Sequence, residues 1–159
     1  GAIIGYTVEE FNQLTDWILE KVPLSYIAIA SWGQNIYLNK VRAEGPNEGR
    51  LINEVVHEHL AGRVPLMATG GINSIEKSRE AIMHAEMVGL SSVFVAEPDF
   101  VAKFQENREE DINLEVGVDD IERLAIPKAA FKDIVLMMDY GKSLPQHTRD
   151  EFRKLEENY

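Results

Sequence analysis

Val64–Ile72 (VPLMATGGI) and Met87–Phe100 (MVGLSSVFVAEPDF) decide the fold of this chain. Each segment starts as an apolar run and then stops in small residues, at Thr69-Gly70-Gly71 in the first and at Ser91-Ser92 in the second. The helical stretch between the two runs has the length of a crossover that returns the chain to a parallel strand. The pattern therefore predicts two neighbouring parallel strands that open into small-residue turns at the same edge of a sheet.

Two such turns side by side suit a phosphate group. Glycine lets the backbone approach a ligand closely, and backbone N–H groups near a helix start can donate to an anion. The loops after the last two strands of a TIM barrel form its common phosphate site. We therefore predict a cofactor-binding site at Thr69, Gly70, Gly71, Ser91 and Ser92, in which the N–H groups of the last four donate. The alternative for the glycine pair is a plain tight turn between a strand and a helix.

The order of the predicted elements indicates the fold class. A helix opened by the capping box of Thr7 and Glu10 is followed by three strand–loop–helix units, with strands at Leu24–Ala30, at residues 64–69 and at Met87–Val95. A helix spans Leu51–Ala61, and Asn73 and Glu76 form a capping box for the next one. The apolar residues of the first helix, Phe11, Leu14, Trp17 and Ile18, are expected on one face.

Connections of this kind are right-handed and build parallel sheets, and a closed TIM barrel needs about 250 residues. We predict an α/β fold in which residues 1–107 form about three C-terminal βα units of a partial TIM (βα)8 barrel. Residues 108–159 are expected to form a helical C-terminal extension, with capping boxes at Asp119/Glu122 and Thr148/Glu151. A small, self-sufficient three-layer α/β domain is the alternative. An open sheet has apolar edges, so we expect self-association or pairing with the remaining part of a barrel.

Composition excludes several classes of function. The 159 residues include 16 basic and 27 acidic ones and have a formal net charge of −11, which argues against nucleic-acid and anionic-membrane partners. Without cysteine the chain has no disulfide, no thiolate metal site and no cysteine nucleophile. No apolar run approaches the roughly 20 residues of a membrane helix, and the first residues do not resemble a signal peptide. A cytoplasmic location is expected.

Few other residues point to chemistry. His57 and His59 lie two apart on a predicted helix and so do not share a face, and we therefore predict no metal site. Trp32 follows the strand Leu24–Ala30, where it is expected either to contact the substrate or to pack in the core. No pattern assigns a catalytic residue.

The chain resembles the old yellow enzyme family, the FMN-containing NAD(P)H-dependent flavin oxidoreductases. The resemblance covers most of residues 6–131 and corresponds to the C-terminal part of the barrel, from the helix before the sixth strand onward. The matching segments are Tyr6–Glu10, Tyr26–Trp32, His59–Leu66, Ala68–Ile72, Val95–Phe100 and Leu124–Lys128.

This resemblance implies FMN as the cofactor, NADH or NADPH as the reductant, and hydride transfer through flavin to an electron-poor alkene. The family holds the flavin phosphate by the turn after strand seven and by a Gly-Arg pair after strand eight. These positions correspond to Gly70-Gly71 and Ser91-Ser92, so serines replace the Gly-Arg pair and its charge is lost.

The family's substrate-binding and proton-donating residues lie in the N-terminal portion of the barrel, so we expect the 159-residue chain to be catalytically inactive by itself. Two alternatives stay open. One is a different phosphate-binding barrel enzyme, such as an aldolase or isomerase. The other is a non-catalytic α/β module that associates through its strand edges.

Overall fold

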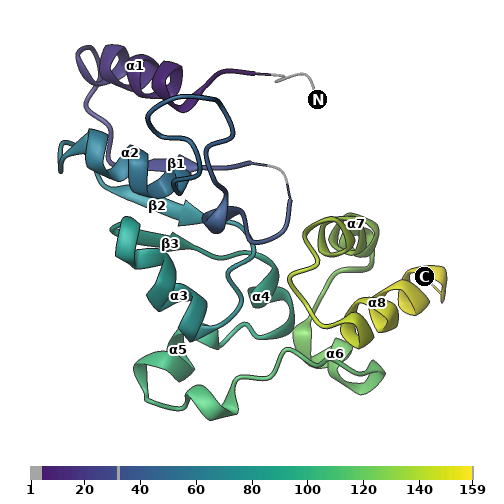
Figure 1. Ribbon diagram of the computed structural model, residues 1–159. Helices are drawn as coiled ribbons and strands as arrows, with labels where there is room; N and C mark the ends of the chain where they lie inside the picture. Colours follow the sequence, from purple (N-terminus) through teal and green to yellow (C-terminus); the bar gives the residue numbers. More distant parts are fainter. Residues whose placement is uncertain (1–4, 32, 159) are drawn as a thin grey trace.

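A three-stranded parallel sheet forms the centre of the computed structural model, which describes residues 5–31 and 33–158 (Figure 1). The strands are β1 (Ile27–Ile29), β2 (Leu66–Thr69) and β3 (Met87–Gly89), and they lie in the order β1-β2-β3. In the register, Ile29 pairs with Ala68 and Thr69 pairs with Gly89. The predicted parallel sheet is confirmed, although each strand is shorter than its apolar run.

Helices surround the sheet and continue beyond it to the C-terminus. The α-helices are α1 (Val8–Leu19), α2 (Ile52–Leu60), α3 (Ile75–Ala81), α4 (Ser92–Ala96), α5 (Phe100–Gln105), α6 (Ile121–Leu124), α7 (Phe131–Gly141) and α8 (Gln146–Asn158). Short 3₁₀ helices lie at η1 (Ile36–Leu38), η2 (Ile82–His84), η3 (Glu109–Asp111), η4 (Val118–Asp120) and η5 (Lys128–Ala130). Among the described residues, no helix combines the length and the apolar character needed to cross a membrane.

The first helix begins as predicted, but most of its apolar face does not pack against the rest of the described chain. Its capping box is complete, because the Thr7 hydroxyl accepts from the Glu10 N–H and the Glu10 carboxylate accepts from the Thr7 N–H. Most of the predicted apolar face is exposed: Leu14, Trp17 and Ile18 are 44%, 56% and 38% exposed. Within the described chain, α1 instead packs on α2 through the face that carries its buried residues Val8, Asn12 and Thr15.

The main core lies around β2, which is flanked by a strand on each side. Leu66 and Ala68 are fully buried there together with Val56 and Leu60. The prediction of a buried first strand is wrong, because β1 is an edge strand and Ala28 at its centre is exposed. A strand is fully buried only when it has a neighbouring strand on each side. In the described sheet β1 has a neighbour on one side only, β2.

A second core joins the C-terminal helices to the sheet region. Ala96 of α4 is fully buried with Val116, Met138 of α7 and Phe152 of α8. Figure 1 shows α7 and α8 next to α4. The C-terminal extension therefore packs against the last βα unit.

Several predicted boundaries differ from the structure. The strand predicted at Met87–Val95 ends at Gly89, and the apolar residues after Ser91 form α4 instead. The hydroxyl of Ser74, not the side chain of Asn73, caps α3 by accepting from the Lys77 N–H at 3.2 Å.

Of the two capping boxes predicted in the extension, the one at Thr148/Glu151 is wrong, and the one at Asp119/Glu122 stays a prediction because the Glu122 side chain lies outside the described part of the structure. Asp119 lies inside η4, and it is the Asp120 carboxylate that accepts from the Gly117 N–H at 3.0 Å. Thr148 lies inside α8, where its buried hydroxyl accepts from the Val116 N–H and donates to the Leu114 carbonyl.

Candidate phosphate-binding turns

The two small-residue turns meet at one edge of the sheet. Because Thr69 pairs with Gly89, the backbone leaves β2 at Gly70 and leaves β3 at Leu90 on neighbouring strands. Gly70 and Gly71 adopt φ values of 89° and 81°, which favour glycine. Among the described residues, none accepts a hydrogen bond from the backbone N–H of Gly70, Gly71, Ser91 or Ser92. The structure thus brings the predicted donors to neighbouring strand ends, where no described residue accepts their hydrogen bonds.

The loop before η1 lies close against the glycine pair. A Cβ atom at Gly71 would stand 2.5 Å from the Asn35 nitrogen, and one at Gly70 would stand 2.6 Å from the Ile36 Cβ. These contacts require glycine at both positions whether or not a ligand binds. The plain-turn alternative therefore has a physical basis that the sequence did not reveal.

Thr69 links strands at this edge. Its hydroxyl donates to the Ile29 carbonyl of β1 at 2.5 Å, so its proton is not available to a ligand. Of the predicted site residues, Thr69 fits a structural role better than a donor role.

The two serines follow β3 directly. Ser91 is exposed and makes no side-chain capping bond to α4, and Ser92 is the first residue of that helix. Their hydroxyls are neutral, so this turn offers polarity without a charge.

A cation that the sequence analysis missed lies at the glycine pair. Lys77 of α3 donates from Nζ to the Gly71 carbonyl at 3.3 Å and to the Asn35 side-chain oxygen at 3.2 Å. No carboxylate of the described residues forms an ion pair with it. Its place in the first turn of a helix that follows the glycine pair is the one signal that could have indicated it.

The C-terminal extension also reaches this region. The Asn73 side chain donates to the Ser143 carbonyl, in the turn between α7 and α8, at 2.5 Å. Trp32, predicted to face the substrate, lies outside the described residues. Its role stays a prediction.

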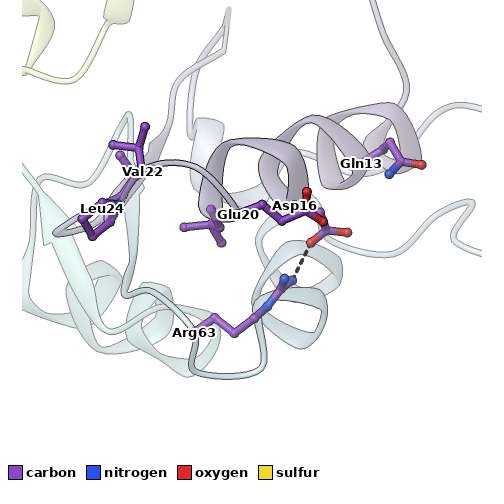
Figure 2. Close-up of a pocket in the computed structure, with 8 residues that line it drawn as sticks. Gln13, Asp16, Glu20, Val22, Leu24 and Arg63 are labelled. Carbon is purple, nitrogen blue, oxygen red and sulfur yellow. Dashed lines mark ion pairs between the residues drawn. The ribbon is translucent and has the colours of Figure 1, made fainter.

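A pocket at the opposite ends of the strands carries a polar cluster (Figure 2). It measures about 590 Å³ and its lining residues include Asp16, Leu24 and Arg63. Arg63 and His59 contact the Asp16 carboxylate at 2.7 and 2.9 Å, and hydrogen bonds from Arg63 first and His59 second lower the pKa of Asp16. Because Leu24 and Arg63 precede β1 and β2, this cluster lies away from the two turns and ties α1 to α2.

A larger pocket of about 760 Å³ runs along β1. The first turn of α1 and the strand itself line it, and its residues include Tyr6, Phe11, Ala28, Ser31 and Ile52. Its lining joins β1, which has one neighbouring strand in the described sheet, to residues of α1 and α2.

His57 and His59 contact different elements. The His57 ring contacts Glu86 at 2.9 Å, whereas the His59 ring contacts Asp16. In the part of the chain that the structure describes, no group of three or more metal-ligating side chains converges.

Comparison with known proteins identifies oxidoreductases among the relatives, while no family model matches the chain. An uncharacterized oxidoreductase of Streptococcus pyogenes serotype M5 (strain Manfredo) is 49% identical over 159 residues, which is all of this chain and 40% of that protein. A probable NADH-dependent flavin oxidoreductase of Bacillus subtilis (strain 168) is 26% identical over 132 residues, 82% of this chain and 34% of that protein.

A further similarity involves another enzyme. The 4-hydroxy-tetrahydrodipicolinate synthase of Brucella abortus biovar 1 (strain 9-941) is 27% identical over 94 residues, 59% of this chain and 30% of that protein. The chain thus spans 40% or less of the length of these three relatives. It is homologous to proteins named as oxidoreductases.

Proposed function

We propose that these residues form the C-terminal part of an FMN-dependent NAD(P)H oxidoreductase of the ene-reductase type. The observation that carries the proposal is the pair of neighbouring turns, whose four backbone N–H groups have no acceptor among the described residues. The two relatives named as oxidoreductases support the reaction class, and the distant one adds NADH and a flavin by its name. The parallel βα order supports a partial barrel.

The residues of the two turns fit the phosphate end of this cofactor. Gly70 and Gly71 would hold one side of the phosphate and Ser91 and Ser92 the other, each through a backbone N–H. Bound FMN supplies the hydride chemistry, and the protein supplies binding, orientation and electrostatics. We propose that this chain is inactive without the rest of a barrel.

The exposed apolar surface suggests where that remainder lies. Trp17 on α1 and Tyr26 beside β1 are 56% and 50% exposed, and residues of α1 and β1 also line the pocket of about 760 Å³. A right-handed crossover places a strand that precedes α1 in the same parallel sheet as β1. We propose that further βα units, or a second copy, cover this surface.

A second candidate is another phosphate-binding barrel enzyme. The two turns would serve a phosphorylated substrate as well as a flavin phosphate. The similarity to a 4-hydroxy-tetrahydrodipicolinate synthase supports only that an enzyme other than an oxidoreductase is among the relatives. The lower share of the chain that matches makes this candidate the weaker one, since 59% aligns here and all of the chain aligns with the streptococcal relative.

Purification of the gene's full product, followed by absorption spectroscopy and an NADH-oxidation assay, tests the proposal. We expect flavin absorbance in the purified protein and oxidation of NADH or NADPH in the presence of an electron-poor alkene. A colourless protein that neither binds added FMN nor oxidises a nicotinamide would favour the second candidate.

A further inference from the structure

Lys77 is a charged residue that forms a hydrogen bond with the glycine turn of the candidate phosphate site. Its ammonium donates to the carbonyl of Gly71, the second residue of the glycine turn, at 3.3 Å. The other acceptor, the Asn35 side-chain oxygen, is also neutral. An ammonium group has three donors, so one N–H of Lys77 is left after these two bonds.

The charge of this lysine lacks a counterion. Among the described residues, no carboxylate pairs with Lys77, although acidic residues outnumber basic ones 27 to 16 in the chain. Arg50 with Glu54 and Lys103 with Glu97, by contrast, bond a carboxylate directly. An unpaired cation beside unpaired N–H groups is the arrangement that an anion completes.

The serine turn explains why such a cation is needed. Neither Ser91 nor Ser92 carries a charge, whereas a phosphate monoester carries one to two negative charges near neutral pH. Thr69 and Gly89 are paired in the sheet, so the glycine turn that follows Thr69 and the serine turn that follows β3 leave neighbouring strands. Lys77 contacts the glycine turn and therefore lies at the same ends of the strands as the serine turn. The Lys77 side chain can therefore pair with an anion that is bound by both turns.

We infer that Lys77 supplies the positive charge of the phosphate site and selects a phosphorylated flavin over the unphosphorylated one. This inference rests on the proposed function and adds to it the residue that determines the phosphate preference. Its contacts with Gly71 and Asn35 hold the ammonium at the turn before the ligand arrives.

The test measures binding of FMN and of riboflavin by calorimetry, using the gene's full product and three variants. Lys77→Gln keeps a hydrogen-bond donor but removes the charge, and Lys77→Arg keeps the charge. Lys21→Gln is the matched control, because Lys21 lies between α1 and β1, at the opposite ends of the strands. We expect Lys77→Gln to weaken FMN binding about tenfold or more, the effect of one charge-assisted hydrogen bond, and to leave riboflavin binding unchanged.

The remaining variants separate charge from structure. Lys77→Arg is expected to bind FMN within about threefold of the wild type, and the control to bind it as the wild type does. The FMN affinity of Lys77→Gln should also depend less on salt than that of the wild type. If the wild type prefers FMN and Lys77→Gln keeps that preference, the inference is wrong and the proposed function stands. If the wild type binds FMN no better than riboflavin, both are wrong.

Discussion

Gly71 shows how a loop contact can require glycine at a position that the sequence assigns to a ligand site. Its φ of 81° disfavours any side chain, and a Cβ there would stand 2.5 Å from the backbone nitrogen of Asn35. Gly62 has a similar φ of 76°, but a Cβ there would meet nothing within 4 Å. The two glycines differ mainly in what surrounds them.

Replacement of Gly71 by alanine should therefore cost more than replacement of Gly62. We expect Gly62→Ala to lower the free energy of unfolding by about 1 kcal/mol from backbone strain alone. Gly71→Ala should lose roughly 1–3 kcal/mol more, because the loop must move away from the turn. Urea denaturation of both variants measures the difference, and equal losses would show that the loop does not lie on the glycine pair.

Residues whose contacts are local were predictable from the sequence, and those with distant contacts were not. The Thr7 capping box depends on a residue three positions away, and the structure confirms it. Thr148 has the same local pattern, yet its hydroxyl bonds to Leu114 and Val116, more than 30 positions before it. Lys77 was missed for the same reason, since one of its two acceptors belongs to Asn35.

At the scale of elements, a buried ion pair holds the region after β3 together. Glu97, which follows α4, accepts from the Lys103 ammonium of α5 at 2.5 Å and from the Asn113 N–H at 3.2 Å. The two side chains of the ion pair are only 5% and 17% exposed. Burial by itself raises the pKa of Glu97, but the hydrogen bonds from Lys103 and Asn113 outweigh it, so the pKa is lowered below 4.5.

This pair predicts a dependence of stability on pH. Because the folded pKa of Glu97 lies below the unfolded one, its ionised form stabilises the fold above about pH 4.5. That contribution is lost as the pH falls through the lower, folded pKa. We expect Glu97→Gln to lose about 3 kcal/mol at pH 7 and to lose less further stability than the wild type in acid.

Glu106→Gln is the matched control for this measurement. Glu106 pairs with Arg108 on the surface, where both side chains are about half exposed, so its loss should cost less than about 1 kcal/mol. Denaturant unfolding of the three proteins between pH 3 and pH 7 provides the comparison. An equal acid sensitivity of Glu97→Gln and the wild type would contradict the assigned role.

The type of each element was predicted better than its end. The apolar run that starts at Met87 continues through Val93, Phe94 and Val95, and a short apolar run fits a strand or a buried helix equally well. The structure resolves the ambiguity by packing: Val93 and Ala96 are buried against different clusters, which a helix allows. In the first helix, by contrast, the apolar spacing predicted the element correctly. Most of its apolar face is nevertheless exposed, because no described residue covers it.

At the scale of the whole molecule, the sheet has two open edges and a helix with an exposed apolar face. Trp17 and Leu14 lie on that face, and exposed apolar groups of this kind mark interaction surfaces. We expect the 159-residue chain to self-associate through this face when the rest of a barrel is absent.

Sedimentation velocity of two variants tests this expectation. Trp17→Gln should shift the chain toward the monomer by removing the largest apolar side chain of the face. Leu136→Gln changes an apolar residue of α7 that is 69% exposed, and should leave the association unchanged. A monomeric wild type, or an equal effect of both substitutions, would contradict the assignment of this face.

Titration of the gene's full product with FMN and with riboflavin tests the central claim most directly, because the two ligands differ only in the phosphate. The four N–H groups of the two turns and the Lys77 ammonium predict that FMN binds about tenfold more tightly or better. Equal affinity for the two flavins, or binding of neither, would show that the turns at Gly70 and Ser91 are structural and hold no flavin phosphate.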